Sequence, residues 1–295
     1  MNFNSESKLL HWIILLALAL VWGSSFILMK KGLEVYPSVE VAGIRLVAAF
    51  IILLPFAIKR FSRIPRDKWK YLVLVGLGNA IPAFLFAEAQ TKIDSSLAGI
   101  LNTATPLFTL LVALLLYKYK TKWLNIAGIF IGLIGTVGLL WVSGEGNIDM
   151  NFHYGSYVIM ATICYAFSLN IVKNNLREID ATSIAAFAFG SIGPFAIIYL
   201  FTATDFVTHV STAENSIMGL VYIIILGVFG SALAVIVFNK LVKVTTVLFS
   251  SSVTYLIPVV AILWGVWDGE IFKWIYLLWI ALILIGVFMV NKINN

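Results

Sequence analysis

Long apolar segments follow one another along almost the whole sequence, and they constrain the fold more than any other feature. A helix needs about 20 mostly apolar residues to cross a bilayer. Ten segments meet this length: residues 11–29, 39–58, 70–89, 96–117, 123–142, 155–173, 183–202, 217–239, 246–267 and 274–291. Most connections between them are short, so neighbouring helices should run antiparallel. The sequence therefore predicts an all-α membrane protein with ten transmembrane helices.

Composition and charge support this class and exclude others. Apolar residues make up 61% of the chain and charged residues 12%, against roughly 25% charged in soluble domains. The net charge is +6, but the basic residues lie between the apolar segments, so we expect no nucleic-acid partner. Cys164 is the single cysteine and no Cys/His metal spacing occurs. We expect neither a metal nor a cofactor.

The basic residues also predict an orientation. With the N-terminus in the cytoplasm, 15 of the 20 Lys and Arg residues fall in inner segments and 4 in outer ones, while Arg45 lies within a span. Basic residues accumulate on the cytoplasmic side of membrane proteins. The expected location is the cell (inner) membrane, with a multi-pass chain and both termini cytoplasmic.

The two halves of the chain resemble each other. A shift of 152 positions aligns Leu74, Gly78, Ala80, Phe86 and Pro106 with Leu226, Gly230, Ala232, Phe238 and Pro258. A shift of 143 aligns Trp22, Ser25 and Lys30 with Tyr165, Ser168 and Lys173. Each half has five predicted helices, an odd number, so the second half enters the membrane from the opposite side. We predict two inverted five-helix repeats, residues 9–142 and 153–291, an arrangement typical of secondary transporters.

Five stretches stand out by their order and spacing: LVWGSSFILMKKG (20–32), VAGIRLVAAFIILLP (41–55), FAEAQTKIDSSLAGILNTATPLFTLLVALLL (86–116), AGIFIGLIGTVGLL (127–140) and GEIFKWIYLLWIALILIGVFMV (269–290). With them the chain resembles the drug/metabolite transporter superfamily, of the EamA-type ten-helix kind. The family often has a Glu after the fourth helix of each half, and Glu270 fits this position in the second half, whereas the first half has Tyr119 and a basic cluster there. The resemblance implies export or exchange of small organic solutes such as amino acids or metabolites.

Polar residues recur inside the predicted helices, where hydrocarbon disfavours them. Their concentration on the first, third, fourth, sixth, eighth and ninth helices predicts a central cavity between these helices. The expected cavity residues are Trp22, Ser25, Asn79, Glu88, Asn102, Thr103, Tyr165, Ser168, Ser251, Thr254 and Tyr255. Helix packing is the alternative role for any single Ser or Thr.

Two prolines and two charges complete the set of candidate residues. Proline clashes with the carbonyl four residues back, so Pro106 frees the carbonyl of Asn102 and Pro258 that of Thr254. We interpret both prolines as hinges beside the cavity, with a purely structural kink as the alternative. Arg45 and Glu88 have matching depths and form a candidate ion pair, and Glu88 could instead face the cavity and carry a proton.

Transport is the function that this pattern favours. An intramembrane enzyme would need buried His, Asp or Cys constellations, and the predicted spans hold no Asp and no central His. A lipid or lipid-linked substrate flippase is the alternative within the transport class. We expect a small-molecule substrate, the lipid bilayer as surroundings, and a monomer. A homodimer through the glycine face of the fifth helix (Gly128, Gly132, Gly135 and Gly138) is the alternative oligomeric state.

Overall fold

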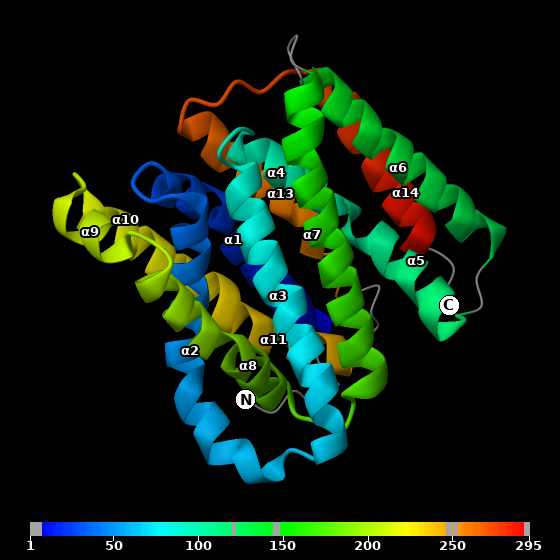
Figure 1. Cartoon of the computed structure of the whole chain (residues 1–295). Coiled ribbons are helices and arrows are strands. Elements are labelled where there is room, and N and C mark those ends of the chain that lie inside the picture. Colours follow the sequence, from blue (N-terminus) through cyan, green and yellow to red (C-terminus); the bar gives the residue numbers. More distant parts are fainter. Residues whose placement is uncertain (1–7, 120–121, 144–147, 246–249, 251–252, 292–295) are drawn as a thin grey trace.

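The structure is a computed structural model, and it describes residues 8–119, 122–143, 148–245, 250 and 253–291. The regular structure of these residues is entirely helical (Figure 1). The helices of the first half are α1 (Lys8–Leu33), α2 (Ser38–Arg60), α3 (Trp69–Ala89), α4 (Ser95–Leu101), α5 (Thr105–Tyr117) and α6 (Trp123–Ser143). Short 3₁₀ turns, η1 (Phe61–Arg63), η2 (Arg66–Lys68) and η3 (Asn102–Ala104), connect some of them.

The second half continues in the same way. Its helices are α7 (Ile148–Asn175), α8 (Ala181–Thr202), α9 (Phe206–Thr212), α10 (Ser216–Ile225), α11 (Ala234–Val244), α13 (Val253–Trp267) and α14 (Tyr276–Asn291). A π-helical segment, η4 (Leu226–Leu233), joins α10 to α11.

Eight helical segments of the described residues are long and apolar enough to cross a membrane. Two further apolar helices, Val253–Trp267 and Tyr276–Val290, are shorter. Each of the ten overlaps one segment expected from the sequence, which confirms an all-helical membrane class. The ninth expected segment includes residues 246–249 and 251–252, which lie outside the described residues.

Two of the eight long segments are interrupted near their middle. The segment Ser95–Tyr117 changes from α4 through η3 to α5 just before Pro106. Proline has no N–H and its ring clashes with the preceding turn, so a local change of helix type is expected here. The segment Ser216–Val244 widens into the π-helical η4, which contains Gly227 and Gly230. Segments of π-helix occur frequently at functional sites.

Helices from opposite halves of the sequence pack against each other throughout the bundle. The most extensive contacts join α6 to α14, α2 to α8, α3 to α7 and α1 to α13. In Figure 1, α6 and α14 run side by side along one edge of the bundle, while α3 and α7 lie together near its centre. The halves are therefore interleaved around one large apolar core.

The glycine face of α6 is used inside the chain. A Cβ added at Gly286 of α14 would lie 2.5 Å from the backbone nitrogen of Gly132 and 2.6 Å from the carbonyl oxygen of Gly128. Such small residues let two helices approach closely. The face that could have formed a dimer seam is thus covered by α14.

We expect Gly286→Ala to lower the free energy of unfolding by about 1–3 kcal/mol, because the new methyl group meets backbone atoms that cannot rotate away. Gly190→Ala is the matched control, since a Cβ at this helical glycine would find its nearest atom at 3.9 Å. Thermal unfolding in detergent measures both variants. Equal melting temperatures for the two would contradict the close α6–α14 contact.

Candidate functional site

A cavity lies between the helices of the two halves. Its volume is about 140 Å³. The walls come from α1, α2 and α3, the region around η3, and from α7, α8, η4, α11 and α13. Because these elements come from both halves of the chain, both halves contribute side chains to a single chamber.

Most of the expected cavity residues line this chamber. Those that do so are Trp22, Ser25, Asn79, Asn102, Tyr165, Ser168 and Thr254. Glu88, Thr103 and Tyr255 are not among its lining residues, and Ser251 lies outside the described residues. Thr103 is buried and donates its hydroxyl to the Ile100 carbonyl 2.6 Å away, a contact within its own turn.

Several polar side chains in the wall donate to helix carbonyls. Trp22 Nε1 donates to the carbonyl oxygen of Gly230 in η4 at 2.9 Å, which joins α1 to the π-helical segment. Asn79 Nδ2 donates to the Val75 carbonyl at 2.7 Å. Hydrogen bonds of this kind satisfy polar groups that lipid could not. They also leave the bodies of the side chains facing the chamber.

The two prolines have different local effects. Before Pro106 the carbonyl of Asn102 accepts the Thr105 hydroxyl at 2.7 Å, so a side chain replaces a donor that the helix has lost. Pro258 lies inside α13, which continues as α-helix around it in the described residues. Neither proline is a lining residue of the cavity.

The expected pair between Arg45 and Glu88 is not formed in this structure. Glu88 Oε2 accepts the hydroxyl of Ser38 at 2.5 Å, at the start of α2. Arg45 Nε donates instead to Ser231 Oγ at 2.7 Å, in η4. The reason is the helical rise of about 1.5 Å per residue, which places Arg45 roughly 10 Å further along α2 than Ser38. Arg45 is a lining residue of the cavity, whereas Glu88 lies at the end of α3 and is not.

Asn239 presents an unusual group to the cavity. It is 5% exposed, and its Nδ2 has no hydrogen-bond partner in the described structure. A buried donor without a partner costs about 1–3 kcal/mol. The side chain lines the chamber, so a bound solute with an acceptor would supply the missing partner.

Aromatic side chains make three ring contacts in the cavity wall, and in one of them Phe26 and Phe86 meet edge to face with ring centroids 5.7 Å apart. Trp22 and Phe238 meet edge to face, with ring centroids 4.9 Å apart. Phe86 and Tyr165 are stacked with centroids 6.0 Å apart. Sequence reasoning identified Trp22 and Tyr165 but not the phenylalanines, because a Phe in an apolar helix has no contrast with its neighbours. The aligned positions Phe86 and Phe238 were the one signal that could have found them.

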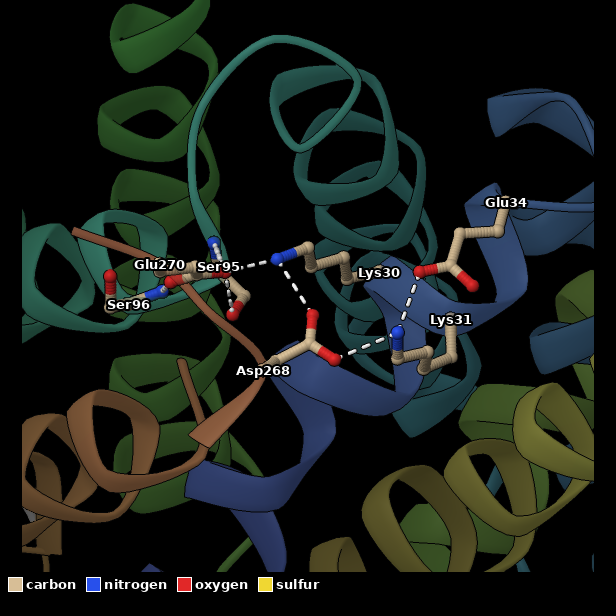
Figure 2. Close-up of polar contacts among 7 residues, drawn as sticks. All are labelled: Lys30, Lys31, Glu34, Ser95, Ser96, Asp268 and Glu270. Carbon is tan, nitrogen blue, oxygen red and sulfur yellow. Dashed lines mark hydrogen bonds and ion pairs between the residues drawn. The ribbon is translucent and has the colours of Figure 1, made fainter. Parts of the chain in front are cut away.

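A network of charged and polar residues joins the end of α1 to the start of α4 and to the loop after α13 (Figure 2). Lys30 Nζ, near the end of α1, lies 2.8 Å from Asp268 Oδ2 and 2.9 Å from Glu270 Oε1. Lys31 Nζ lies 2.7 Å from both Asp268 Oδ1 and Glu34 Oε1. Asp268 thus joins both lysines (Figure 2). Met29, the residue before Lys30, lines the cavity.

Glu270 is the buried centre of this network. Its side chain is 3% exposed, and it accepts the backbone N–H groups of Ser95 and Ser96, each at 3.0 Å, together with the Ser95 hydroxyl at 2.6 Å. Burial alone would raise the pKa of Glu270, but the hydrogen bonds from Ser95, Ser96 and Lys30 outweigh it and lower that pKa. One carboxylate therefore ties the loop after α13 to α1 and to the start of α4.

The opposite end of the bundle carries a second hollow, of about 340 Å³, lined by Val172, Val242 and three basic residues. Val172 lines the cavity as well, so the two spaces adjoin. Lys173 of α7 donates to the Val242 carbonyl of α11 at 3.0 Å. Lys243 of α11 donates to the Arg177 carbonyl at 2.9 Å. At this end the lysines donate to carbonyl oxygens near the C-terminal ends of α7 and α11. The helix dipole makes this a favourable position for a cation.

Long apolar helices around a chamber with polar and aromatic walls define a multi-pass membrane transporter. The sequence pattern of the EamA-like transporter family matches residues 10–141 and 155–292. The chain belongs to this family and so to the drug/metabolite transporter superfamily. The resemblance seen in the sequence is confirmed.

Individual relatives agree with this assignment. An uncharacterized inner membrane transporter of Escherichia coli (strain K12), YedA, is 29% identical over 285 residues, covering 94% of this chain and 89% of its own. An S-adenosylmethionine/S-adenosylhomocysteine transporter of Chlamydia muridarum is 24% identical over 84% of this chain and 80% of its own. A solved crystal structure shares the fold with a TM-score of 0.65 at 16% identity, over 97% of this chain and 98% of its own.

We expect Glu270→Gln to lower the free energy of unfolding at pH 7 by about 3 kcal/mol, because Lys30, Ser95 and Ser96 lose the buried carboxylate to which they donate. Lys30 then keeps only its pair with Asp268. The pKa of Glu270 is lowered on folding, so the carboxylate stabilises the protein above its ordinary pKa of about 4.3 and loses this effect as the pH falls through the lowered value. The difference between variant and wild type should therefore shrink in acid.

Glu34→Gln is the control for this measurement. Glu34 also pairs with a lysine of the network, but its side chain is 54% exposed, and exposed pairs contribute about 0–1 kcal/mol. Thermal unfolding at several pH values compares the two variants. Equal effects of both substitutions, or an undiminished effect of Glu270→Gln in acid, would refute the role given to Glu270.

Proposed function

We propose that this protein is a secondary transporter that exports or exchanges small organic solutes, such as amino acids or metabolites, by alternating access to the central cavity. The observation that carries the proposal is the chamber itself, which has walls from both halves and one buried donor, Asn239 Nδ2, without a partner. A solute that binds there is in contact with elements that can move relative to each other. The Chlamydia relative, a metabolite transporter by name, agrees with this substrate class.

The proposed architecture is ten membrane-crossing helices in two inverted repeats, residues 9–142 and 153–291. The helix contacts support it. If α1 corresponds to α7, α3 to α10–α11, and α4–α5 to α13, the most extensive contacts between the halves have counterparts. Thus α1 against α13 corresponds to α7 against α4 and α5, and α3 against α7 corresponds to α10–α11 against α1. The pairs α2–α8 and α6–α14 correspond to themselves.

The aromatic pairs support the same equivalence. The alignment of the halves places Trp22 on Tyr165 and Phe86 on Phe238. In the structure Trp22 contacts Phe238, and Tyr165 contacts Phe86. The two pairs are thus equivalent under the repeat, and we propose that they hold the solute from two sides as the halves move.

The proposed orientation places both termini in the cytoplasm of a cell with the chain in its inner membrane, as the basic residues predict. The network around Glu270 then lies on the outer side, and we propose that it acts as the outer gate. The hollow next to Val172 leads toward the cytoplasm. Pro106, beside the break at η3, and Pro258 are proposed hinges, since a helix with fewer internal hydrogen bonds bends more easily.

Asn239→Leu tests the proposed cavity. The variant removes a donor that has no partner in the protein, so the melting temperature should stay the same or rise. The apparent affinity for a transported solute should fall about tenfold, the equivalent of one hydrogen bond of roughly 1.4 kcal/mol. The measurement is counterflow of radiolabelled L-amino acids and aromatic carboxylic acids in vesicles that contain the purified protein.

Asn174→Leu is the matched control, because Asn174 lies near the end of α7 and is not a lining residue of the cavity. Wild type and control should exchange the same solutes with the same affinity. If Asn239→Leu left the apparent affinity for the exchanged solute unchanged, the solute would not bind at Asn239 and the proposed site would be wrong. Failure of the wild type to exchange any solute, combined with transfer of a labelled lipid between leaflets, would replace the proposal with lipid transport.

A further inference from the structure

We propose that the cavity selects solutes that carry one carboxylate and an aromatic or other apolar body, with the carboxylate bound by Arg45. The inference rests on the proposed function, since it names the substrate class of the same cavity. Acids of net charge −1 should bind better than zwitterions, neutral amides or amines of the same shape. The argument comes from the charges and contacts of the cavity wall.

Arg45 is the one charged residue among the described lining residues. Its Nε donates to Ser231 Oγ, and it interacts electrostatically with Tyr165 on the facing helix. No ion pair joins it to any carboxylate of the described residues. A guanidinium has five donors in a planar fork that matches the geometry of a carboxylate. The Nε contact orients this fork, and its other nitrogens carry the charge without a counter-ion.

A cation inside a membrane protein is costly unless an anion pairs with it. Here none of the described lining residues is Asp or Glu, so the wall offers no carboxylate to Arg45. It also offers none to the ammonium group of a zwitterion or an amine. A solute carboxylate would supply the counter-charge that the protein lacks, which favours acids over their amides and amines.

The hollow beside the cavity has the same sign of charge. Lys173, Arg177 and Lys243 line it, together with two valines. Both lysines donate to carbonyl oxygens rather than to carboxylates, so their charges are not cancelled there. Asp180, the acid that acts on Lys243, is itself paired with Arg60. An approach lined with one sign of charge raises the local concentration of oppositely charged solutes.

The number of cations limits the charge of the solute. Phosphate groups and other multiply charged anions are usually held by several basic side chains, whereas this chamber has one. Helix α8, which packs against α2 across the bundle, has no charged residue. Arg45 therefore breaks the equivalence of the two halves, and this asymmetry gives the solute one orientation. The aromatic pairs Trp22–Phe238 and Phe86–Tyr165 leave apolar surface for the rest of the molecule.

A series of four probes of one shape tests the inference: 3-phenylpropionate, L-phenylalanine, 3-phenylpropionamide and 3-phenylpropylamine. Binding to the purified protein in nanodiscs is measured by calorimetry, which needs no transport. We expect the acid to bind at least about tenfold more tightly than the amide, as a charge-assisted pair should allow, and the amine to bind most weakly. Arg45→Gln should abolish the preference for the acid, and Arg45→Lys should retain part of it.

Arg66→Gln is the control, because Arg66 is an exposed residue in η2 outside the cavity. It should keep the wild-type order of affinities. Equal binding of acid and amide by the wild type, binding of the acid unchanged in Arg45→Gln, or no binding of any probe would overturn the inference. The comparison of acid and amide binding to the wild type tests the inference even if an Arg45 variant does not fold. Binding in the expected order without exchange across vesicles would instead contradict the proposed transport while supporting the carboxylate site.

Discussion

Hydrocarbon offers no hydrogen bonds, and this constraint determines how the polar residues of the chain are arranged. A polar group at the depth of the lipid tails must find its partner inside the protein. Several threonine hydroxyls donate to a carbonyl oxygen of their own helix, as Thr109 does to Thr105 and Thr136 to Gly132. The exceptions are then informative. Asn239 Nδ2 has no partner in the described structure and Arg45 has no carboxylate, and both line the same chamber.

The same constraint gives the two ends of the bundle different strengths. At one end Glu270 is buried and joins Lys30 to the backbone of Ser95 and Ser96. At the other end Lys173 and Lys243 bind helix carbonyls, and hydrogen bonds to charged groups contribute about 1.5–3 kcal/mol each. Removal of one partner from a buried ion pair costs more, about 3–5 kcal/mol. The two ends are therefore held by different kinds of interaction, a buried carboxylate at one end and lysine contacts with backbone carbonyls at the other.

Much of the fold could be predicted from the sequence, because long apolar segments and the polar residues within them stand out from their surroundings. For this reason the sequence predicts Trp22, Asn102 and Tyr165 as cavity residues, and all three line the chamber. The partners of Glu88 and Arg45 could not be predicted, since the sequence fixes neither the relative depth of residues on two different helices nor the direction of a side chain around its helix axis. Glu88 turns toward Ser38 and Arg45 toward Ser231.

Contacts between distant parts of the sequence were also hidden. The sequence marks Glu270 only as a family position, because its partners Lys30 and Ser95 precede it by 240 and 175 residues. A wide helical turn such as η4 leaves no clear mark in the sequence either. Its glycines suggest close packing, but the π-helical geometry that brings the Gly230 carbonyl to Trp22 appears only in the folded chain.

The central claim is that one cavity communicates with the two sides of the membrane in turn, with the network around Glu270 as the proposed outer gate. The most direct test is the reactivity of a single cysteine at Thr254, a lining residue, in a Cys164→Ala background. An impermeant thiol reagent is added to one side or the other of oriented vesicles. The account predicts labelling from the cytoplasmic side, and added labelling from the outside when Glu270→Gln weakens the outer network. Labelling from neither side, or outside labelling that Glu270→Gln leaves unchanged, would contradict it.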